Sequence, residues 1–191
     1  MSKIRLAMIG CGGNSSGHAR QLKRNPDVQI AAACDVSKEI AKRYIDSNLP
    51  ELDPRPGAFD DVAKMLAKVK PDAVLISTPH TLHFKQGMMA LDAGCHVFME
   101  KPMVTSSEDA YKLAEKVRQT GKVFVIGYNT PCSANFYYLR EQVRKKGLGK
   151  LELVTGYITQ NWMRATTGTW RQKPELSGGG QAYDSGAHLL N

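Results

Sequence analysis

Glycines and small polar residues follow a short apolar segment near the start of the chain. The segment at 3–10 ends at Gly10, and the next residues include Gly12, Gly13, Asn14 and Ser15. A glycine at the turn, and a second one without a Cβ, let a diphosphate approach the backbone, and the following helix N-terminus supplies free N–H groups. These residues therefore predict a dinucleotide-binding turn, with Ser15 standing where the fingerprint has its third glycine.

An acidic residue supports this interpretation. Asp35 follows the second apolar segment and lies 25 residues after Gly10. A carboxylate at this place accepts hydrogen bonds from ribose hydroxyls and repels a 2′-phosphate, so it favours NAD over NADP. Lys38 and Arg43 are close in sequence and could soften that preference. Without a ligand, the same glycines would be an ordinary turn between a strand and a helix.

The segment STPHTLHF (77–84) follows a third apolar segment. Ligands of open parallel sheets bind at the carboxyl ends of the strands, so we expect Ser77, Thr78 and Pro79 to face the cofactor. His83 comes one helical turn later and is a further candidate for cofactor binding. Taken alone, a histidine at this place is more often a packed or capping residue.

A second polar group, Glu100 and Lys101, stands at the end of a fourth apolar segment, and Pro102 fixes the backbone direction after it. A lysine beside a nicotinamide can donate or accept a proton, or stabilise an alkoxide. The alternative interpretation is a surface Glu–Lys pair that precedes a loop.

The elements that must position these residues alternate along the chain. Near-continuous apolar segments are typical of strands buried on both faces, and amphipathic helical patterns lie between them. This alternation predicts a doubly wound parallel sheet of the Rossmann type over residues 1–125. The expected strands are 3–10, 28–34, 72–78, 96–100 and 123–128, and the expected helices are 15–24, 37–47, 60–69, 81–93 and 106–122.

The pattern changes after about residue 148. Residues 150–163 alternate between apolar and polar side chains, which predicts a half-exposed antiparallel strand. A helix begins close to the last residues of the sequence. We therefore expect residues 126–191 to hold a linker helix and the first, incomplete part of a second domain.

Five segments together resemble the Gfo/Idh/MocA family, the glucose-fructose oxidoreductase and inositol dehydrogenase group. They are GCGG, CD, STPHTLHF, AGCHVFMEKP and GGGQAYDSGAH, in the expected order. The resemblance implies an N-terminal Rossmann domain that binds NAD(P), and an α+β substrate domain with a mainly antiparallel sheet. Family chains are longer, so the second domain is expected to be truncated here, and a homo-oligomer is expected when it is complete.

The resemblance also assigns residues. Lys101 matches the catalytic or substrate-orienting lysine, Asp184 and His188 match the family's acidic residue and catalytic histidine, and Trp170 and Arg171 match a segment near the cofactor. Asp184 and His188 are four residues apart, so on one helix they would share a face.

These assignments predict an NAD-dependent oxidoreductase that transfers a hydride between nicotinamide and a hydroxyl or carbonyl of a sugar, cyclitol or related polyol. His188 would remove the hydroxyl proton, Lys101 would stabilise the alkoxide, and Asp184 would hold a neighbouring hydroxyl. Two alternatives stay open. One is a glycosidase that uses transient oxidation by bound NAD, and the other is a dinucleotide-binding module without catalysis.

Composition limits the other classes of function. The net charge is +8, but no dense basic run or nucleic-acid motif accompanies it, so we expect no nucleic-acid partner. The four cysteines are far apart, which favours a reducing compartment without disulfides or a metal site. The sequence contains no signal peptide and no apolar segment of membrane-spanning length, so we expect a cytoplasmic protein without a membrane partner.

Overall fold

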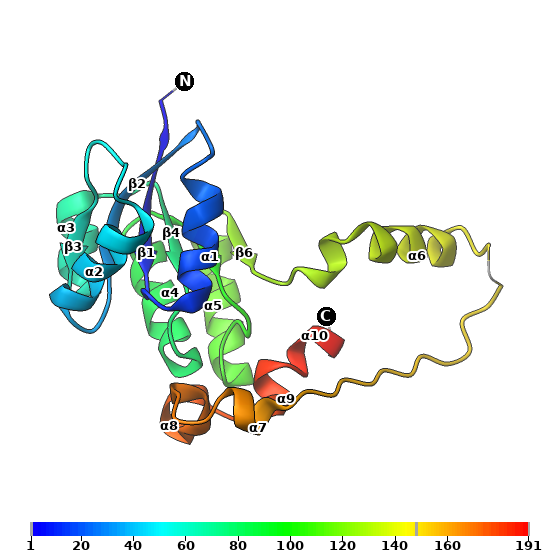
Figure 1. The fold of residues 1–191 in the computed structure, drawn as a ribbon. Helices are drawn as coiled ribbons and strands as arrows, with labels where there is room; N and C mark the ends of the chain where they lie inside the picture. Colours follow the sequence, from blue (N-terminus) through cyan, green and yellow to red (C-terminus); the bar gives the residue numbers. More distant parts are fainter. Residues whose placement is uncertain (1, 148, 191) are drawn as a thin grey trace.

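The chain folds around a six-stranded parallel sheet (Figure 1), in a computed structural model that describes residues 2–147 and 149–190. The strand order is β3-β2-β1-β4-β5-β6. The chain thus starts in the middle of the sheet, builds one half, and then crosses to the other side of β1. The strands are β1 (Ile4–Ile9), β2 (Val28–Cys34), β3 (Gly57–Phe59), β4 (Ala73–Ile76), β5 (His96–Met99) and β6 (Phe124–Ile126).

All five predicted strands are present, with ends that differ from the prediction by at most two residues. The edge strand β3 is missing from the prediction. It has three residues, none of them fully buried, and it follows Pro54 and Pro56. A strand this short, next to two prolines, carries too little apolar pattern to be separated from a loop.

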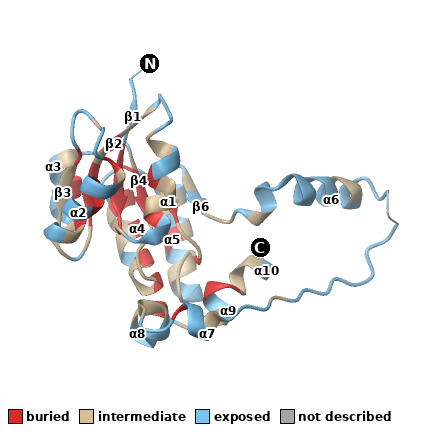
Figure 2. Cartoon of the chain, in the orientation of Figure 1, coloured by how far each residue is buried: buried red, intermediate tan, exposed pale blue. Residues whose placement is uncertain are grey.

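Helices cover both faces of the sheet. In β1, Leu6 and Met8 pack into the cluster beneath two helices, whereas Ala7 and Ile9 pack into the cluster beneath the other three. Figure 2 shows the buried residues concentrated in the strands between these layers. The predicted doubly wound α/β fold is therefore confirmed. The helices are α1 (Gly13–Leu22) and α2 (Lys38–Asn48) on one face, and α3 (Val62–Val69), α4 (His83–Asp92) and α5 (Ser107–Thr120) on the other.

The helix ends follow their capping residues. The Ser37 side chain accepts a hydrogen bond from the Ile40 amide at the start of α2, and Ser106 accepts one from the Asp109 amide at the start of α5. Gly121 ends α5 in the left-handed conformation, with φ of 63°. The caps explain why these helix limits were predictable within two residues.

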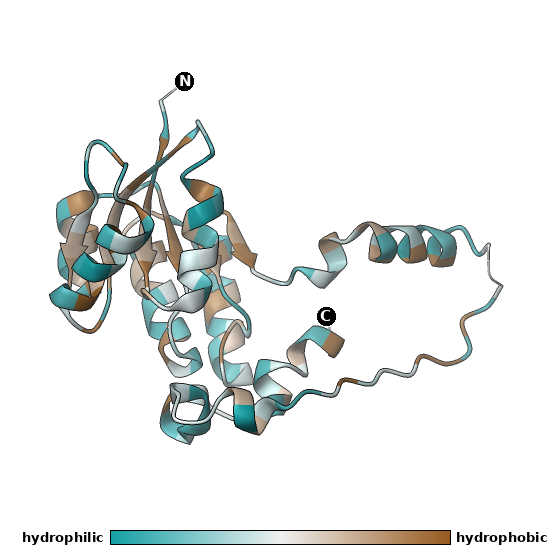
Figure 3. Cartoon of the chain, viewed as in Figure 1, coloured by the Kyte–Doolittle hydropathy of each residue, from teal (hydrophilic) through white to brown (hydrophobic). Residues whose placement is uncertain are grey.

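After β6 the chain leaves the sheet as an arm (Figure 1), through the 3₁₀ turn Thr130–Cys132 and α6 (Ala134–Arg144). No residue of α6 is buried, and Tyr138 and Leu139 are among its exposed apolar side chains. Figure 3 shows apolar and polar residues side by side on this arm.

The segment that follows α6 differs from the prediction. Residues 150–160 form no regular element, and the end of the predicted strand is instead the start of α7 (Trp162–Ala165). A strand needs a partner for its backbone N–H and C=O groups, and the described residues contain no strand paired with this segment. The domain limits at residues 125 and 126 stay a prediction.

The chain then returns across the carboxyl ends of the strands, as the return segment (162–190). Thr81 links the return segment to the turn after β4, because its hydroxyl hydrogen is shared between the backbone carbonyls of Glu175 and Leu176. The return segment therefore covers the edge at which ligands of doubly wound sheets bind. Its short elements are α7, the 3₁₀ turn Trp170–Gln172, α8 (Pro174–Ser177), α9 (Gln181–Asp184) and α10 (Ala187–Leu190).

Candidate active site

The glycine turn lies between β1 and α1 at the centre of the sheet. Gly10 has φ of 93°, and a Cβ on it would lie 2.6 Å from the carbonyl oxygen of Ser77, so this position requires glycine. A Cβ on Gly12 or Gly13 would meet no protein atom within 4 Å. Gly12 also caps α1 without a side-chain hydrogen bond. The turn thus leaves open space at a helix N-terminus, which fits a diphosphate.

Asp35 lies beside this turn at the end of β2. Its Oδ2 accepts a hydrogen bond of 2.7 Å from the Cys11 amide, and its Oδ1 accepts one of 2.7 Å from the Val36 amide. Asp35 and Gly12 line one cavity of about 430 Å³. The turn after β4 supplies its other wall with Ser77, Thr78 and Pro79, and Trp170 and Leu176 of the return segment also line it.

Two predicted cofactor-binding residues lie beneath the site surface. Ser15 is fully buried, and its hydroxyl is 2.8 Å from that of Tyr44 on α2. At the third position of the fingerprint, the serine thus joins α1 to α2 and does not reach the cavity. His83 is also fully buried, with Nδ1 2.8 Å from the carbonyl oxygen of Pro102 and Nε2 3.0 Å from that of Thr78. It braces the two turns that carry the site residues.

Lys101 meets Asp184 at the centre of the site. Its Nζ donates to Oδ1 of Asp184 over 2.6 Å and to the backbone carbonyl of Asp184 over 2.7 Å. The other carboxylate oxygen, Oδ2, accepts hydrogen bonds of 3.0 Å from Nε1 of Trp162 and from Nε of Arg171. Asp184 therefore joins the return segment to the lysine at the end of β5.

This environment controls the charge of Asp184. Burial would raise the pKa of the carboxyl group, but hydrogen bonds from Lys101 and Trp162, with the charges of Lys101 and Arg171, lower it to about 2. Asp184 is thus an anion at neutral pH, and both its oxygens are occupied by groups of the protein. A neighbouring substrate hydroxyl, its predicted partner, would have to share them.

His188 faces the same region from α10. It lines a cavity of about 480 Å³ together with Gly13, Asn14, Glu100 and Lys101. Burial and the Lys101 charge lower its pKa. Its ring meets that of Tyr128 edge-on, with centroids 5.9 Å apart.

Asp184 and His188 do not share a helix, so the prediction of one common helix face is wrong. Asp184 is the last residue of α9, whereas His188 belongs to α10. The chain turns between them at Gly186, whose amide bonds back to the Gln181 carbonyl. The turn, and not the helical spacing, brings both side chains towards Lys101.

The Trp170–Arg171 pair lies over the glycine turn. Both residues line a small cavity of about 140 Å³ with Gly12, Gly13 and Lys101. The Arg171 guanidinium carbon lies 4.5 Å from the centre of the Trp170 ring. These contacts place the pair between the predicted diphosphate site and the lysine.

Sequence reasoning missed three polar residues of this site. His80 is almost fully buried and lines the same small cavity. Trp162 binds Asp184, but its position coincided with the end of a predicted strand. His18 on α1 places Nε2 2.7 Å from Oε1 of Glu100. Only His80 carried a signal, because it lies within the motif that holds Ser77 to Pro79.

Within residues 2–147 and 149–190, no group of three or more histidine, cysteine or acidic side chains is arranged to hold a metal ion. None of the helices in that part of the chain has the length and apolar character needed to cross a membrane.

Known proteins are similar to this chain in sequence and in fold. The chain is 31% identical over 195 residues to a D-glucoside 3-dehydrogenase of Escherichia coli strain K12, covering all of this chain and 53% of that protein. It is 28% identical to glycosyl hydrolase family 109 protein 2 of Akkermansia muciniphila, covering 96% and 41%. The chain thus spans about half the length of the curated relatives that it matches.

Among solved structures, an NAD-binding oxidoreductase from Klebsiella pneumoniae superposes with a TM-score of 0.84. The match covers 99% of this chain and 52% of that one, at 23% identity, so it shows the fold alone. Two family models match the sequence as well. One describes an oxidoreductase family with an NAD-binding Rossmann fold and matches residues 4–128. The other, the C-terminal domain of the same family, matches residues 136–191.

The first family model covers well over half of the chain, and the matched residues 4–128 include the glycine turn, Asp35 and Lys101 described above. This family model describes an NAD-binding fold, in agreement with NAD as the predicted cofactor. The predicted resemblance is thereby confirmed, and the chain belongs to the Gfo/Idh/MocA family of oxidoreductases.

Proposed function

We propose that this chain supplies the cofactor site and the proton-transfer groups of an NAD-dependent oxidoreductase acting on a sugar, cyclitol or related polyol. The observation that carries the proposal is the cavity shared by Gly12, Gly13, Lys101 and Trp170. It places an ammonium group beside the turn that fits a diphosphate.

The residues proposed for the cofactor are those that line the two cavities at the glycine turn. The backbone of Gly12 and Gly13 and the N-terminus of α1 hold the diphosphate, and Asp35 binds the adenosine ribose. Ser77, Thr78, Pro79 and Trp170 enclose the remaining part. NAD, when bound, accepts or supplies the hydride.

Lys101 and His188 handle the proton. His188 has a lowered pKa and is therefore neutral at neutral pH, so it can accept the hydroxyl proton of the substrate. Lys101 stabilises the negative charge that develops on the oxygen. The two roles can be exchanged, because both side chains line the same cavity.

Asp184 acts chiefly through Lys101. It holds the ammonium group by two oxygens, the Oδ1 atom and the backbone carbonyl, and so restricts where Nζ can lie. We infer that Asp184 orients the lysine, and that any contact with a substrate hydroxyl is secondary to this.

The test measures binding and turnover separately. Calorimetry with NAD gives the affinity, and NADH absorbance over a panel of sugars and cyclitols gives the activity. Substitution of Lys101 by Met is expected to abolish turnover and to keep NAD binding within about threefold. A matched control, Lys116→Met, removes a lysine that pairs with Asp92 on α4. Normal turnover in the Lys101→Met variant would refute the proposal.

A second candidate is an NAD-dependent glycosidase that oxidises the sugar transiently. It is favoured by the similarity to the glycosyl hydrolase family 109 protein. Release of a sugar from a glycoside without net NADH would support this candidate over the dehydrogenase. NAD binding without either reaction would instead support a binding module without catalysis.

Three broader expectations belong with the proposal. A second domain with a mainly antiparallel sheet would pair with residues 150–160, and a homo-oligomer would form through that sheet. Light scattering of a protein that includes the complete second domain, at several concentrations, tests the oligomer. The four cysteines are unpaired, which supports a cytoplasmic location, to be checked by cell fractionation.

A further inference from the structure

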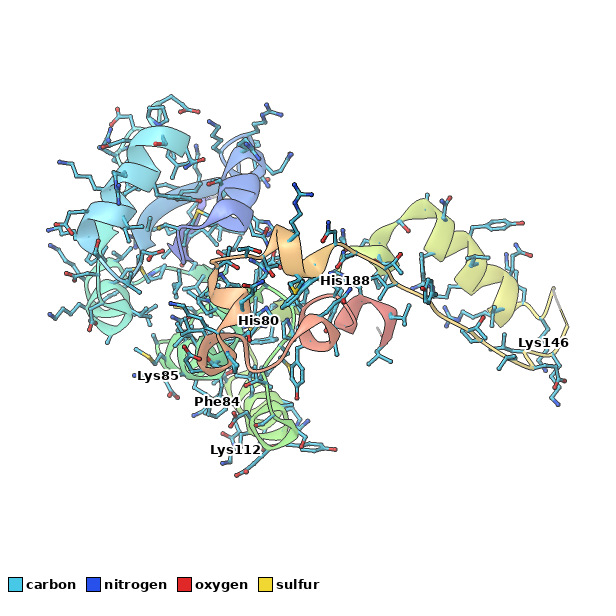
Figure 4. The ribbon with its side chains drawn as sticks, turned by 60° about the horizontal axis from the view of Figure 1, so that its bottom comes forward. His80, Phe84, Lys85, Lys112, Lys146 and His188 are labelled. Atoms are coloured by element: carbon cyan, nitrogen blue, oxygen red, sulfur yellow. The ribbon has the colours of Figure 1, made fainter. Side chains whose placement is uncertain are left out.

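His80 is a buried histidine that has no role in the proposed mechanism. It is the first residue of a short 3₁₀ turn (His80–Leu82) after β4, and only 3% of its surface is exposed. Its ring meets that of Trp170 edge-on, with centroids 4.7 Å apart. Figure 4 shows His80 beneath the return segment, on the same side as His188.

One ring nitrogen of His80 has a fixed role. Nδ1 lies 3.0 Å from the carbonyl oxygen of Ser177, and a carbonyl can only accept, so Nδ1 carries the hydrogen. In the neutral ring, Nε2 then has a lone pair. This Nε2 lies 3.8 Å from Oδ1 of Asp184.

The same carboxylate oxygen is already bound by Lys101. Its Nζ lies 2.6 Å from Oδ1, whereas Trp162 and Arg171 bind Oδ2. Two nitrogen bases, Lys101 and His80, therefore share one anionic oxygen. In a buried site, positive charges on both would repel each other.

The surroundings keep His80 neutral while Lys101 is charged. Burial, followed by the charges of His83 and Lys101, lowers the pKa of His80 to about 4, although Ser177 and Asp184 oppose this. The charged or titratable groups around the ring are His83 on α4, Glu100 and Lys101 after β5, Asp184 on α9 and Arg171 in the Trp170–Gln172 turn. From α8, the ring receives only the Ser177 carbonyl in the described contacts.

We propose that His80 is a positioning residue coupled to Lys101 through Oδ1 of Asp184, so that its affinity for a proton rises when Lys101 loses its positive charge. The inference rests on the proposed function with its two roles exchanged, in which Lys101 and not His188 transfers the proton. When an N–H bond of Lys101 breaks and the proton forms the O–H bond of the alcohol, the negative charge of Oδ1 acts more strongly on Nε2 of His80, 3.8 Å away. Oδ2 keeps its cationic partner Arg171 throughout.

The test follows the protonation of His80 by NMR of its imidazole ¹⁵N nuclei. The chain has five histidines, and loss of one signal set in His80→Asn assigns the resonance. In the Lys101→Met variant, we expect the pKa of His80 to rise by at least about one unit, a tenfold gain in proton affinity. In Lys116→Met, a lysine change on the outer surface, it stays as in the wild type.

A double variant identifies the partner. In Lys101→Met with Asp184→Asn, the rise disappears, because the anion that His80 would pair with is gone. A measurement on the wild type does not depend on whether any variant folds. Its spectrum at neutral pH shows the tautomer with hydrogen on Nδ1.

Three results would overturn the inference: an unchanged pKa in Lys101→Met, an equal rise in the double variant, or hydrogen on Nε2 in the wild type. The titration uses neither cofactor nor substrate. Failure here therefore leaves the proposed oxidoreductase intact, and a protein without turnover can still show the coupling between His80 and Lys101.

Discussion

The backbone amide of Cys11 donates a hydrogen bond of 2.7 Å to Oδ2 of Asp35, although 24 residues separate them. The contact joins the glycine turn to the end of β2. It leaves the carboxylate in one orientation, with Oδ1 fixed by the Val36 amide. An acceptor held in this way loses little freedom when it binds a ribose hydroxyl.

Asp35→Ala should weaken NAD binding by about 10- to 100-fold, because hydrogen bonds to a charged group contribute about 1.5–3 kcal/mol. The same variant should lose its discrimination against NADP, since the repulsion of a 2′-phosphate is gone. Calorimetry with both nucleotides measures the change. Asp27→Ala, which changes an exposed turn residue just before β2, is the control. Unchanged NAD affinity in Asp35→Ala would contradict the assignment.

Gly12→Ala should weaken NAD binding without destabilising the fold. Its backbone has φ of −86° and no protein atom lies within 4 Å of the added Cβ, so the free energy of unfolding should change by less than about 1 kcal/mol. NAD affinity should fall at least about tenfold, because the methyl group occupies the space of the diphosphate.

Gly10→Ala is the matched comparison. It forces a left-handed backbone and a contact of 2.6 Å with Ser77, which should lower the free energy of unfolding by roughly 2–4 kcal/mol. Urea denaturation measures both variants. Equal stability of the two would argue against this account of the turn.

The pH dependence of stability should carry a contribution from Asp184. Its pKa is lowered to about 2 in the folded chain, below the value near 3.8 of a free carboxyl group. The ion pairs therefore stabilise the fold by about 2 kcal/mol above pH ~4, and this is lost as the pH falls towards 2. Tryptophan fluorescence reports it, since both tryptophans lie in the return segment. The stability difference between wild type and Asp184→Asn should shrink over that range, and a constant difference would refute the argument.

The pH–rate profile should show the lowered pKa of His188. If it accepts the hydroxyl proton, kcat/KM falls when the imidazole is protonated, so the acid limb should lie below pH ~6.5. In His188→Ala, this limb should vanish from the residual activity. A limb that persists in the variant would assign the proton acceptor to another group.

His83→Phe should destabilise the fold by roughly 1–3 kcal/mol, because the neutral ring donates one hydrogen bond, to the carbonyl of Pro102 or of Thr78, and that carbonyl loses its partner. His96→Ala removes an exposed histidine from β5 and should cost less than about 1 kcal/mol. Chemical denaturation of both variants provides the comparison. Similar losses of stability in both variants would show that the contacts of His83 stabilise the fold no more than those of an exposed histidine.

The sequence was sufficient for the elements with a strong local signal. The glycine turn, the caps at Ser37 and Ser106, and the apolar strands each combine a pattern with a local cause. The edge strand β3 was missed because its position depends on pairing with β2 and not on its own three residues.

The site was less predictable than the fold. Motifs located Lys101 and Asp184, but their contact spans 83 residues of chain and depends on the path of the return segment. Trp162 and His80 enter the site through that same path. The assumed helix through Asp184 and His188 failed because spacing alone does not reveal the turn at Gly186.

The central place of β1 has a consequence during synthesis. It pairs with β2 on one side and with β4 on the other, and β4 ends at Ile76. At ~5–20 residues per second, the ribosome needs roughly 4–14 s to reach that point after β1 emerges. During this interval one edge of β1, whose Leu6–Ile9 are buried in the folded chain, has no strand beside it, and an unpaired strand edge can pair with another chain.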